Sequence, residues 1–420
     1  MNEWKETTLG KLAEVQTGPF GSQLKNEQYI SGGTPVVTVE HIKNFLIEDF
    51  VYPSVTAEDK DTLSRYVLKS GDIVFSRVGS VDLSALVKEH QDGWLFSSRM
   101  LRVRVKEKLD TNFLSYYLRQ PSIRQFIINI SVGSTMPSIN TEILKSLPIV
   151  YCSLEEQKEI ADVLSCLDRK IKNLRRQNET LEAIAQTLFK HWFIDFEFPD
   201  ADGKPYKSSG GEMIDSAIGD IPEGWQVGKL GDIGQVITGK TPSTQSPELW
   251  GYDLPFITPT DFKNYGKYIL DAERRISQLA SSQFKRYVIP ANSIVVTCIG
   301  SDMGKVAKTA ISCVTNQQIN SIIPFENFSF HEYIFNYLKN QYKLLRNIAL
   351  GGSTMPIINK SAFSNIEIIL PSLEILNLFE NIVDPLNEKI INNQNQIQTL
   401  TKTRDALLPK LMSGQLRIEE

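Results

Sequence analysis

The most regular pattern of apolar and polar positions occurs twice, once before the middle of the chain and once at its C-terminal end. In both stretches the apolar positions alternate steps of four and three residues, the spacing of a coiled-coil seam. Each seam would occupy about 50 Å of helix at ~1.5 Å per residue, a longer surface than one small domain can cover. The aliphatic seam residues are Ile160, Leu164, Leu167, Ile171, Leu174, Leu181 and Leu188, and then Val383, Leu386, Ile390, Ile397, Leu400, Leu407 and Leu411. We therefore predict that the two helices pair with each other, antiparallel if a two-fold relates the halves.

Polar residues and prolines interrupt this pattern. Asn178, Asn393 and Arg404 stand at seam positions, where a polar residue lowers stability but can fix the register and the partner of a helix. Pro385 and Pro409 fall within the second stretch. A proline inside a helix removes one hydrogen bond and clashes with the preceding turn, so we predict that each kinks or interrupts the second helix.

The chain before each helix is of mixed character. Short runs of β-branched residues, punctuated by Gly, Pro, Asn and Asp, predict strands there. One helix is predicted in each copy, from 112 to about 129 and from 331 to about 347. Serines at natural N-cap positions, Ser153 and Ser372, predict where the long helices begin.

The mixed regions are similar to each other. Trp4, Leu9 and Gly10 return as Trp225, Leu230 and Gly231, and Gly-Ser-Thr-Met-Pro occurs at 133–137 and at 352–356. A repeat of about 220 residues is too long for a solenoid unit and indicates a duplicated half-molecule. The repeated pentapeptide fits a turn after a helix better than a direct ligand contact.

These patterns predict an α+β fold with a pseudo-two-fold internal repeat, in which two similar mixed α/β domains are joined by two long helices forming an antiparallel coiled coil. The predicted boundaries are a first domain at 1–152, a helix at 153–197, a linker at 198–221, a second domain at 222–371, and a second helix with the C-terminal tail at 372–420.

Composition excludes several classes of protein. The net charge of −4 is not the bulk signature of a nucleic-acid binder. No stretch approaches the ~20 apolar residues of a membrane span, and the N-terminus has no secretory signal. The four cysteines and four histidines show no disulfide framework and no metal-ligand spacing. We therefore expect a cytoplasmic chain with no metal site, and we find no catalytic constellation.

One stretch, Gly234 to Thr241, matches the sequence pattern of a phosphate-binding loop. Lys240 would then neutralise phosphates and Thr241 would hold magnesium. However, a phosphate-binding loop must open a helix, and Pro242 with Ser243 reads as loop. A nucleotide-binding protein and a coiled-coil scaffold with no DNA role are the two alternative functions.

Residues suited to nucleic acid lie in the stretches expected to be loops. Arg and Lys can bind phosphates or guanine edges, and Asn or Gln can pair with adenine edges. The candidates are Lys25, Ser76, Arg77, Ser80, Arg99 and Arg102 in the first copy, and Lys240, Thr241, Ser243, Lys263, Lys305, Asn316, Gln317 and Gln318 in the second. Arg99 and Gln317 fall at about equivalent positions. For each candidate, the alternative is a solvated surface residue.

Three signatures carry a resemblance to a known family. The central block runs Leu188-Phe189-Lys190-His191-Trp192-Phe193-Ile194-Asp195-Phe196, followed by Ser209-Gly210-Gly211-Glu212-Met213 and by Ile221-Pro222-Glu223-Gly224-Trp225. The second is Ser153-Leu154-Glu155-Glu156-Gln157, and the third is Trp4 with Leu9-Gly10. With these residues the chain closely resembles the specificity (S) subunit of type I restriction–modification systems. It departs from the pattern at Glu374-Ile375-Leu376 in the second copy.

The resemblance implies two target recognition domains, each reading one half of a bipartite, asymmetric DNA site. The paired helices would set the spacer and dock two methyltransferase (M) subunits, and two restriction (R) subunits would complete the complex. S-adenosylmethionine, ATP and magnesium are expected on those partners, and none in this chain, which would be a non-catalytic subunit. No base-contacting residue is carried over from the family.

Overall fold

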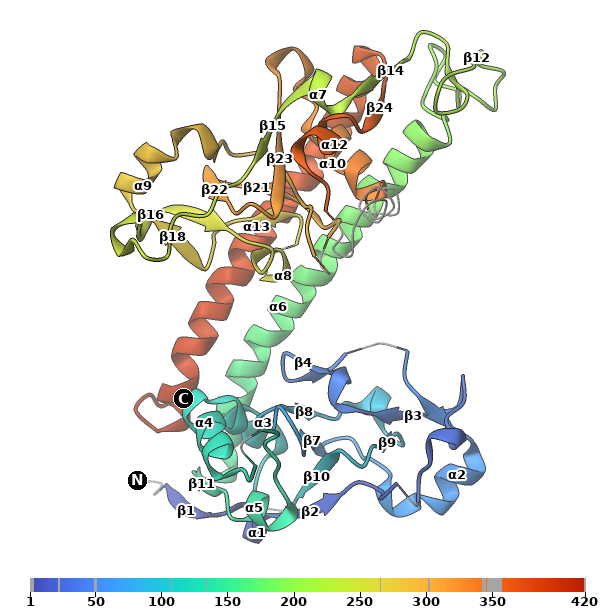
Figure 1. Cartoon of the computed structure of the whole chain (residues 1–420). Coiled ribbons are helices and arrows are strands. Elements are labelled where there is room, and N and C mark those ends of the chain that lie inside the picture. Colours follow the sequence, from blue (N-terminus) through green and yellow to red (C-terminus); the bar gives the residue numbers. More distant parts are fainter. Residues whose placement is uncertain are drawn as a thin grey trace. The chain divides into compact units, whose positions relative to one another are not determined.

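A computed structural model describes residues 4–418, except 22, 49–50, 107, 134, 265, 301–302, 342–344 and 346–356. The chain forms two compact units (Figure 1). The first unit contains Met1–Ile171 and Thr399–Glu420, and the second contains Lys172–Gln398. Each unit therefore holds one mixed domain together with a part of each long helix.

In the first unit, a four-stranded sheet of order β2-β10-β7-β8 carries the mixed domain, and a smaller sheet of order β6-β3-β9 lies beside it. A separate antiparallel pair, β1 with β11, joins the two ends of the domain. The strands are β1 Lys5–Thr8, β2 Ala13–Thr17, β3 Thr34–Val37, β4 Ile42–Lys43, β5 Leu46–Ile47, β6 Ser54–Val55, β7 Ile73–Ser76, β8 Ser84–Leu86, β9 Leu95–Phe96, β10 Met100–Val105 and β11 Pro148–Tyr151. The helices are α1 Leu9–Leu12, α2 Ala57–Thr62, α3 Thr111–Arg119, α4 Pro121–Ile130 and α5 Thr141–Lys145. Val15, Phe75 and Leu101 of the larger sheet pack into one core with α3 and the long helices.

The second unit repeats this plan with a five-stranded sheet of order β15-β23-β20-β21-β17 and a four-stranded sheet of order β18-β16-β22-β19. The strands are β12 Met213–Ile214, β13 Ile221–Pro222, β14 Gln226–Lys229, β15 Gly234–Thr238, β16 Trp250–Ile257, β17 Tyr268–Ile269, β18 Arg274–Ile276, β19 Val288–Ile289, β20 Ile294–Thr297, β21 Val306–Thr309, β22 Cys313–Thr315, β23 Ile319–Pro324 and β24 Glu367–Leu370. The helices are α7 Leu230–Ile233, α8 Asp261–Asn264, α9 Gln278–Gln283, α10 His331–Asn340 and α12 Lys360–Ser364.

Equivalent hydrogen bonds confirm the internal repeat. The N–H of Gly18 donates to the carbonyl of Met100 at 3.0 Å, and the N–H of Gly239 donates to the carbonyl of Ile319 at 3.1 Å. The N–H of Leu9 donates to Leu147 just as that of Leu230 donates to Ile366. A parallel strand pair also recurs, β3 with β9 and β16 with β22.

The prediction of a single helix from 112 to about 129 is wrong. Two helices, α3 and α4, meet at Gln120 and Pro121. Proline has no N–H to continue the first helix, but its fixed φ suits the first position of the next one. In the second copy α10 ends at Asn340, and the predicted end near 347 lies outside the described residues. The second Gly-Ser-Thr-Met-Pro, at 352–356, also lies outside them.

The long helices are α6 (Leu154–Phe189), which continues as one π-helical turn at Lys190–Ile194, and α13 (Leu373–Met412). Of the two effects predicted for Pro385 and Pro409, a kink or an interruption, the interruption does not occur, since α13 runs through both. Both prolines are on the exposed side of α13. The carbonyls that lose their helical partners belong to Asn381 and Asp405, which are also exposed residues, so water can replace the lost hydrogen bonds.

The predicted antiparallel pairing of the helices is confirmed within each unit (Figure 1, green and red). In the second unit, Asn393 Nδ2 donates to Asn178 Oδ1 at 2.9 Å. Further along α6, Phe189 packs on Phe379, which comes earlier in α13, with ring centroids 6.1 Å apart. In the first unit, Arg404 Nη1 donates to Asp168 Oδ1 at 2.7 Å. None of the predicted seam residues is exposed.

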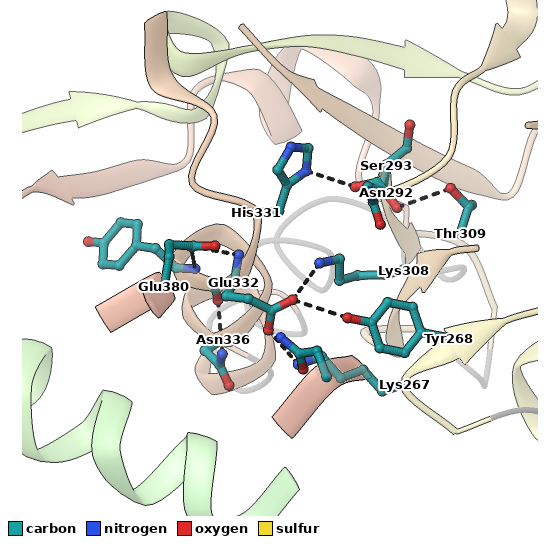
Figure 2. Close-up of polar contacts among 12 residues, drawn as sticks. Lys267, Tyr268, Asn292, Ser293, Lys308, Thr309, His331, Glu332, Asn336 and Glu380 are labelled. Atoms are coloured by element: carbon teal, nitrogen blue, oxygen red, sulfur yellow. Dashed lines mark hydrogen bonds and ion pairs between the residues drawn. The ribbon is translucent and has the colours of Figure 1, made fainter. Parts of the chain in front are cut away.

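A cluster of buried charges ties the second domain to α13 (Figure 2). Glu332, in the first turn of α10, has no exposed surface, and its carboxylate forms ion pairs with the ammonium groups of Lys267 and Lys308. Lys267 Nζ also donates to Asn387 Oδ1 of α13 at 2.5 Å. Burial would raise the pKa of Glu332, but the two ammonium groups outweigh it and lower that pKa to about 2. The cluster thus connects the sheet, α10 and the long helix.

Glu380 of α13 makes a second connection by capping α10. Its Oε1 accepts hydrogen bonds from the N–H groups of Glu332 at 2.9 Å and of Tyr333 at 3.0 Å. Phe330, at the N-cap, has no side-chain cap of its own, whereas Asp110 caps α3 in the first copy. Burial and the charge of Glu332 raise the pKa of Glu380 to about 8.

The Asn178–Asn393 contact predicts a difference between single and double substitutions. Asn393→Leu should lower the free energy of unfolding by ~1–3 kcal/mol, because it leaves the buried amide of Asn178 without its partner. The double variant Asn178→Leu/Asn393→Leu should recover most of that loss, because both polar groups are gone. Denaturant unfolding of the purified chain measures both. A double variant less stable than either single one would contradict this account.

The buried carboxyl of Glu380 predicts a pH dependence. Its pKa is raised from 4.5 to about 8 in the folded chain, so the folded state holds a proton that the unfolded state has lost. This contribution is complete below about pH 4.5 and is lost as the pH rises through about 8. Glu380→Gln keeps an accepting oxygen without the charge and should raise the melting temperature at pH 9. Glu388→Gln, on an exposed position of the same helix, should not, and equal gains from both would disprove the assignment.

Candidate nucleic-acid interface

The loop that follows β15 meets the turn between β22 and β23 at one tip of the second domain. The N–H of Lys240 donates to the carbonyl of Thr315 at 2.9 Å, which holds the two segments together. The hydroxyl of Thr241 donates to Gln317 Oε1. Lys240 and Gln317 are exposed, and Lys240 Nζ lies 5.8 Å from the ring centroids of Phe284 and Tyr287. The structure thus brings together three residues predicted to bind DNA.

In both copies a glycine allows the loop after the first strand of the larger sheet to cross closely over the turn before its paired strand. We call this close approach the glycine crossing. A Cβ on Gly239 would lie 2.2 Å from the carbonyl oxygen of Thr315, and one on Gly18 would lie 2.0 Å from that of Ser97. Both contacts are with backbone, which cannot swing aside. No other residue fits, so the two tips share one rigid crossing that presents the residues beside it.

The phosphate-loop alternative does not survive this geometry. Gly234–Thr238 is strand β15, and between Thr241 and the short 3-10 turn Pro247–Leu249, a stretch that is described throughout, no helix begins. The N–H groups of Gly239 and Lys240 are bonded to strand carbonyls. Amides engaged in this way cannot surround a phosphate.

The equivalent tip of the first domain carries different side chains. Arg77 Nη1 donates to Thr17 Oγ1 at 3.3 Å, and the N–H of Arg77 donates to the carbonyl of Arg99 at 2.8 Å. Arg99 and Ser80 are exposed. Phe20 is 57% exposed at the position equivalent to Thr241. Sequence reasoning missed Phe20 because it searched only for polar residues, although Gly and Pro beside it marked a loop.

The sequence profile described as "Type I restriction modification DNA specificity domain" matches residues 1–183 and again residues 222–402. The chain belongs to this specificity family. It is 32% identical over 440 residues to the type I restriction enzyme MjaIX specificity subunit of Methanocaldococcus jannaschii, covering 100% of this chain and 97% of that relative. It is 29% identical to the HindI specificity subunit of Haemophilus influenzae, covering 99% of this chain and 100% of the relative.

A solved structure supports the fold of the family. The crystal structure of the type I restriction–modification S subunit from M. genitalium superposes with a TM-score of 0.60 at 18% identity. The match covers 98% of this chain and 96% of that one. The two domains with paired helices are therefore shared by specificity subunits of low sequence similarity.

Several residues of this specificity subunit lie away from the loops in which they were expected. Ser76 ends β7 with no exposed surface and donates to the carbonyl of Val78 at 3.1 Å. Arg102 lies within β10 and is 3% exposed. Asn316 is 9% exposed and donates to Gln318 Oε1 at 3.0 Å. The loop assignment was wrong for Ser76 and Arg102, because strands this short give too few positions for a period.

The strand register also corrects one equivalence. Met100 and Ile319 occupy the same place in the two glycine crossings, so Arg99 corresponds to Gln318 rather than to Gln317. The remaining candidates are outside the two tips as defined by these contacts. Lys25 precedes a 3-10 turn, Ser243 is in the loop after Thr241, Lys263 is in α8, and Lys305 directly precedes β21. Their role in binding DNA stays a prediction.

Among the described residues, no group of three or more His, Cys, Asp or Glu side chains is placed to hold a metal ion. Among the described helices, none combines the length and the apolar character needed to cross a membrane.

Proposed function

We propose that this chain is the DNA sequence-recognition subunit of a type I restriction–modification complex, and that each mixed domain reads one half of a bipartite, asymmetric site. The observation that supports it is one scaffold with two sets of tip residues. Both copies keep the glycine crossing, but Arg99 and Phe20 in the first stand where Gln318 and Thr241 stand in the second. Arginine pairs best with guanine and glutamine with adenine, so the two domains would prefer different bases.

The paired helices would set the spacer between the half-sites. Their antiparallel contacts support this role, because each unit holds one domain with a part of each helix, and both helices are continuous from one unit into the other. One heptad adds about 10.5 Å of helix at ~1.5 Å per residue. That length equals roughly three base pairs at ~3.4 Å each.

The helices would also dock two methyltransferase (M) subunits, and two restriction (R) subunits would complete the complex. Exposed apolar side chains on the long helices support docking, among them Leu378 at 40% and Ile382 at 43% exposure, one turn apart on α13. S-adenosylmethionine, ATP and magnesium would be held by those partners, and this chain would perform no catalysis. The complex would act in the cytoplasm.

Exchange of one domain tests the assignment of half-sites. Residues 1–150 are replaced by the same region of a relative with a different target, and the chain is expressed with its partner subunits. Methylome sequencing should then show one altered half-site and one unchanged. Exchange of 222–371 should alter the other half. A change in both halves, or in neither, after the first exchange would show that the domains do not read separately.

A matched insertion tests the spacer. Seven residues that continue the seam are added after Leu174 in α6 and after Gln396 in α13, two positions that face each other on the same side of the Asn178–Asn393 contact. The methylated site should keep both halves and gain roughly three base pairs between them, at ~3.4 Å per base pair. The control inserts the heptad into α6 alone, which destroys the matching of the seams and should abolish methylation. An unchanged gap in the matched variant would refute the role of the helices.

A further inference from the structure

A hollow of about 680 Å³ opens on the first domain, on the side of the larger sheet that faces the smaller one. Its walls are β2, at the edge of the sheet, the neighbouring strand β10, and the segment 64–69. The charged residues that line it are Glu14, Arg65, Lys69, Arg102 and Arg104. These residues are distant in the sequence, and strand pairing brings them together.

Positive charge exceeds negative charge in the hollow. The two oxygens of Asp72, beneath Arg104, accept from its Nε at 2.7 Å and from its Nη2 at 2.6 Å, so that carboxylate is already paired. Glu14 Oε1 lies 3.1 Å from Arg102 Nη2. Arg65 and Lys69 are exposed, and within the described part of the chain neither makes an ion pair. Two basic side chains at the mouth are therefore left for an anion.

Arg102 is held at the base of the hollow. Its side chain is 4% exposed, and its Nε has no hydrogen-bond partner among the described residues. Its Nη1 reaches the carbonyls of Arg65 and Val67 only at 3.4 and 3.3 Å, which are long for hydrogen bonds. A buried guanidinium is costly unless its donors are satisfied. An anion entering the hollow would supply a partner.

The second domain lacks this arrangement. Ser321 and Ile323 occupy the places of Arg102 and Arg104 in the paired strands, since β23 pairs with β15 as β10 pairs with β2. Pro290 stands where the first copy has Lys69. Only Arg286 is retained, at the position of Arg65 and in the same contact with the following tyrosine. This basic lining is a property of the first copy.

We propose that the hollow binds a backbone phosphate of the DNA, close to the half-site read by the first domain. This inference rests on the proposed function and adds to it a phosphate contact whose basic residues are present in only one domain. Guanidinium and ammonium groups are the usual partners of phosphate oxygens. A phosphate contact fixes position and adds affinity, but it does not read sequence. The hollow should therefore raise the affinity for every duplex and leave the recognised sequence unchanged.

The double variant Arg65→Ala/Lys69→Ala tests the proposal, because both side chains are exposed and neither supports the core. With the partner subunits bound, the dependence of log Kobs on log salt for the cognate duplex should become shallower, by about 0.9 for each phosphate that the variant no longer binds. The methylated sequence should stay the same. Arg286→Ala, the matched control in the second domain, should leave the slope unchanged, and an equal change there would overturn the role of the hollow.

Neutralising single phosphates locates the contact. Duplexes that each carry one methylphosphonate are bound by the wild-type complex and by the double variant. One position should weaken the wild type and have no effect on the variant, because the two changes remove the same interaction. Inorganic phosphate that raises the melting temperature of the wild type only, with no sensitive position in the duplex, would assign the hollow to a free anion and overturn the proposal.

The outcomes also separate the phosphate contact from the proposed function. A wild-type complex that binds the cognate duplex, with a double variant of the same affinity and slope, would disprove the phosphate contact and leave the proposed function intact. A wild-type complex that binds duplexes without any sequence preference would disprove the proposed function, and one that binds no duplex would disprove both.

Discussion

Burial of the helix seams is the constraint on which the rest of the molecule depends. Each long helix presents a narrow apolar stripe that water would otherwise cover, and pairing removes both stripes from water at once. The contacts within the pair also fix its register, since Asn178 meets Asn393 in one unit and Asp168 meets Arg404 in the other. A shift of one heptad would leave each of these polar groups against an apolar neighbour. The mixed domains are built on helices whose register is already determined.

The two copies attach their domains to the helices with different chemistry. In the first unit, Asp168 of α6 accepts from Tyr116 at 2.8 Å and from Arg119 at 2.7 Å, both on α3. Burial would raise the pKa of Asp168, but the hydrogen bond from Arg404 and the charge of Arg119 hold it below its usual value. In the second unit the attachment is the buried Glu332 cluster, with Glu380 capping α10. The carboxylate at the centre of this attachment keeps 25% of its side-chain surface exposed in the first copy, at Asp168, and none in the second, at Glu332.

Sequence reasoning succeeded where a pattern repeats many times. Many turns of regular spacing identify the seams, and two copies of one scaffold identify the duplication, so the fold class and the pairing could be predicted. It failed where a single residue decides the local structure, such as the end of a helix. Pro121 divides a helix that periodicity joins, while Pro385 divides nothing, although both prolines are exposed. The residue type alone therefore does not decide whether a proline ends a helix. Ser76 and Arg102 were misplaced because a four- or six-residue strand has no measurable period.

The candidate site illustrates the same limit at the level of chemistry. Residues next to Gly18 and Gly239 could be proposed because glycine and proline mark loops, and the tips do contain Arg99, Lys240 and Gln317. Arg65, Lys69 and Arg104 could not be proposed, because nothing local connects a 3-10 turn with a strand that begins more than thirty residues later. Comparison of the two copies identifies Lys69 and Arg104 once the structure is known, whereas Arg65 is retained as Arg286. A basic side chain replaced by serine, isoleucine or proline in the other copy is not needed by the scaffold, and what the scaffold does not need is available for a ligand.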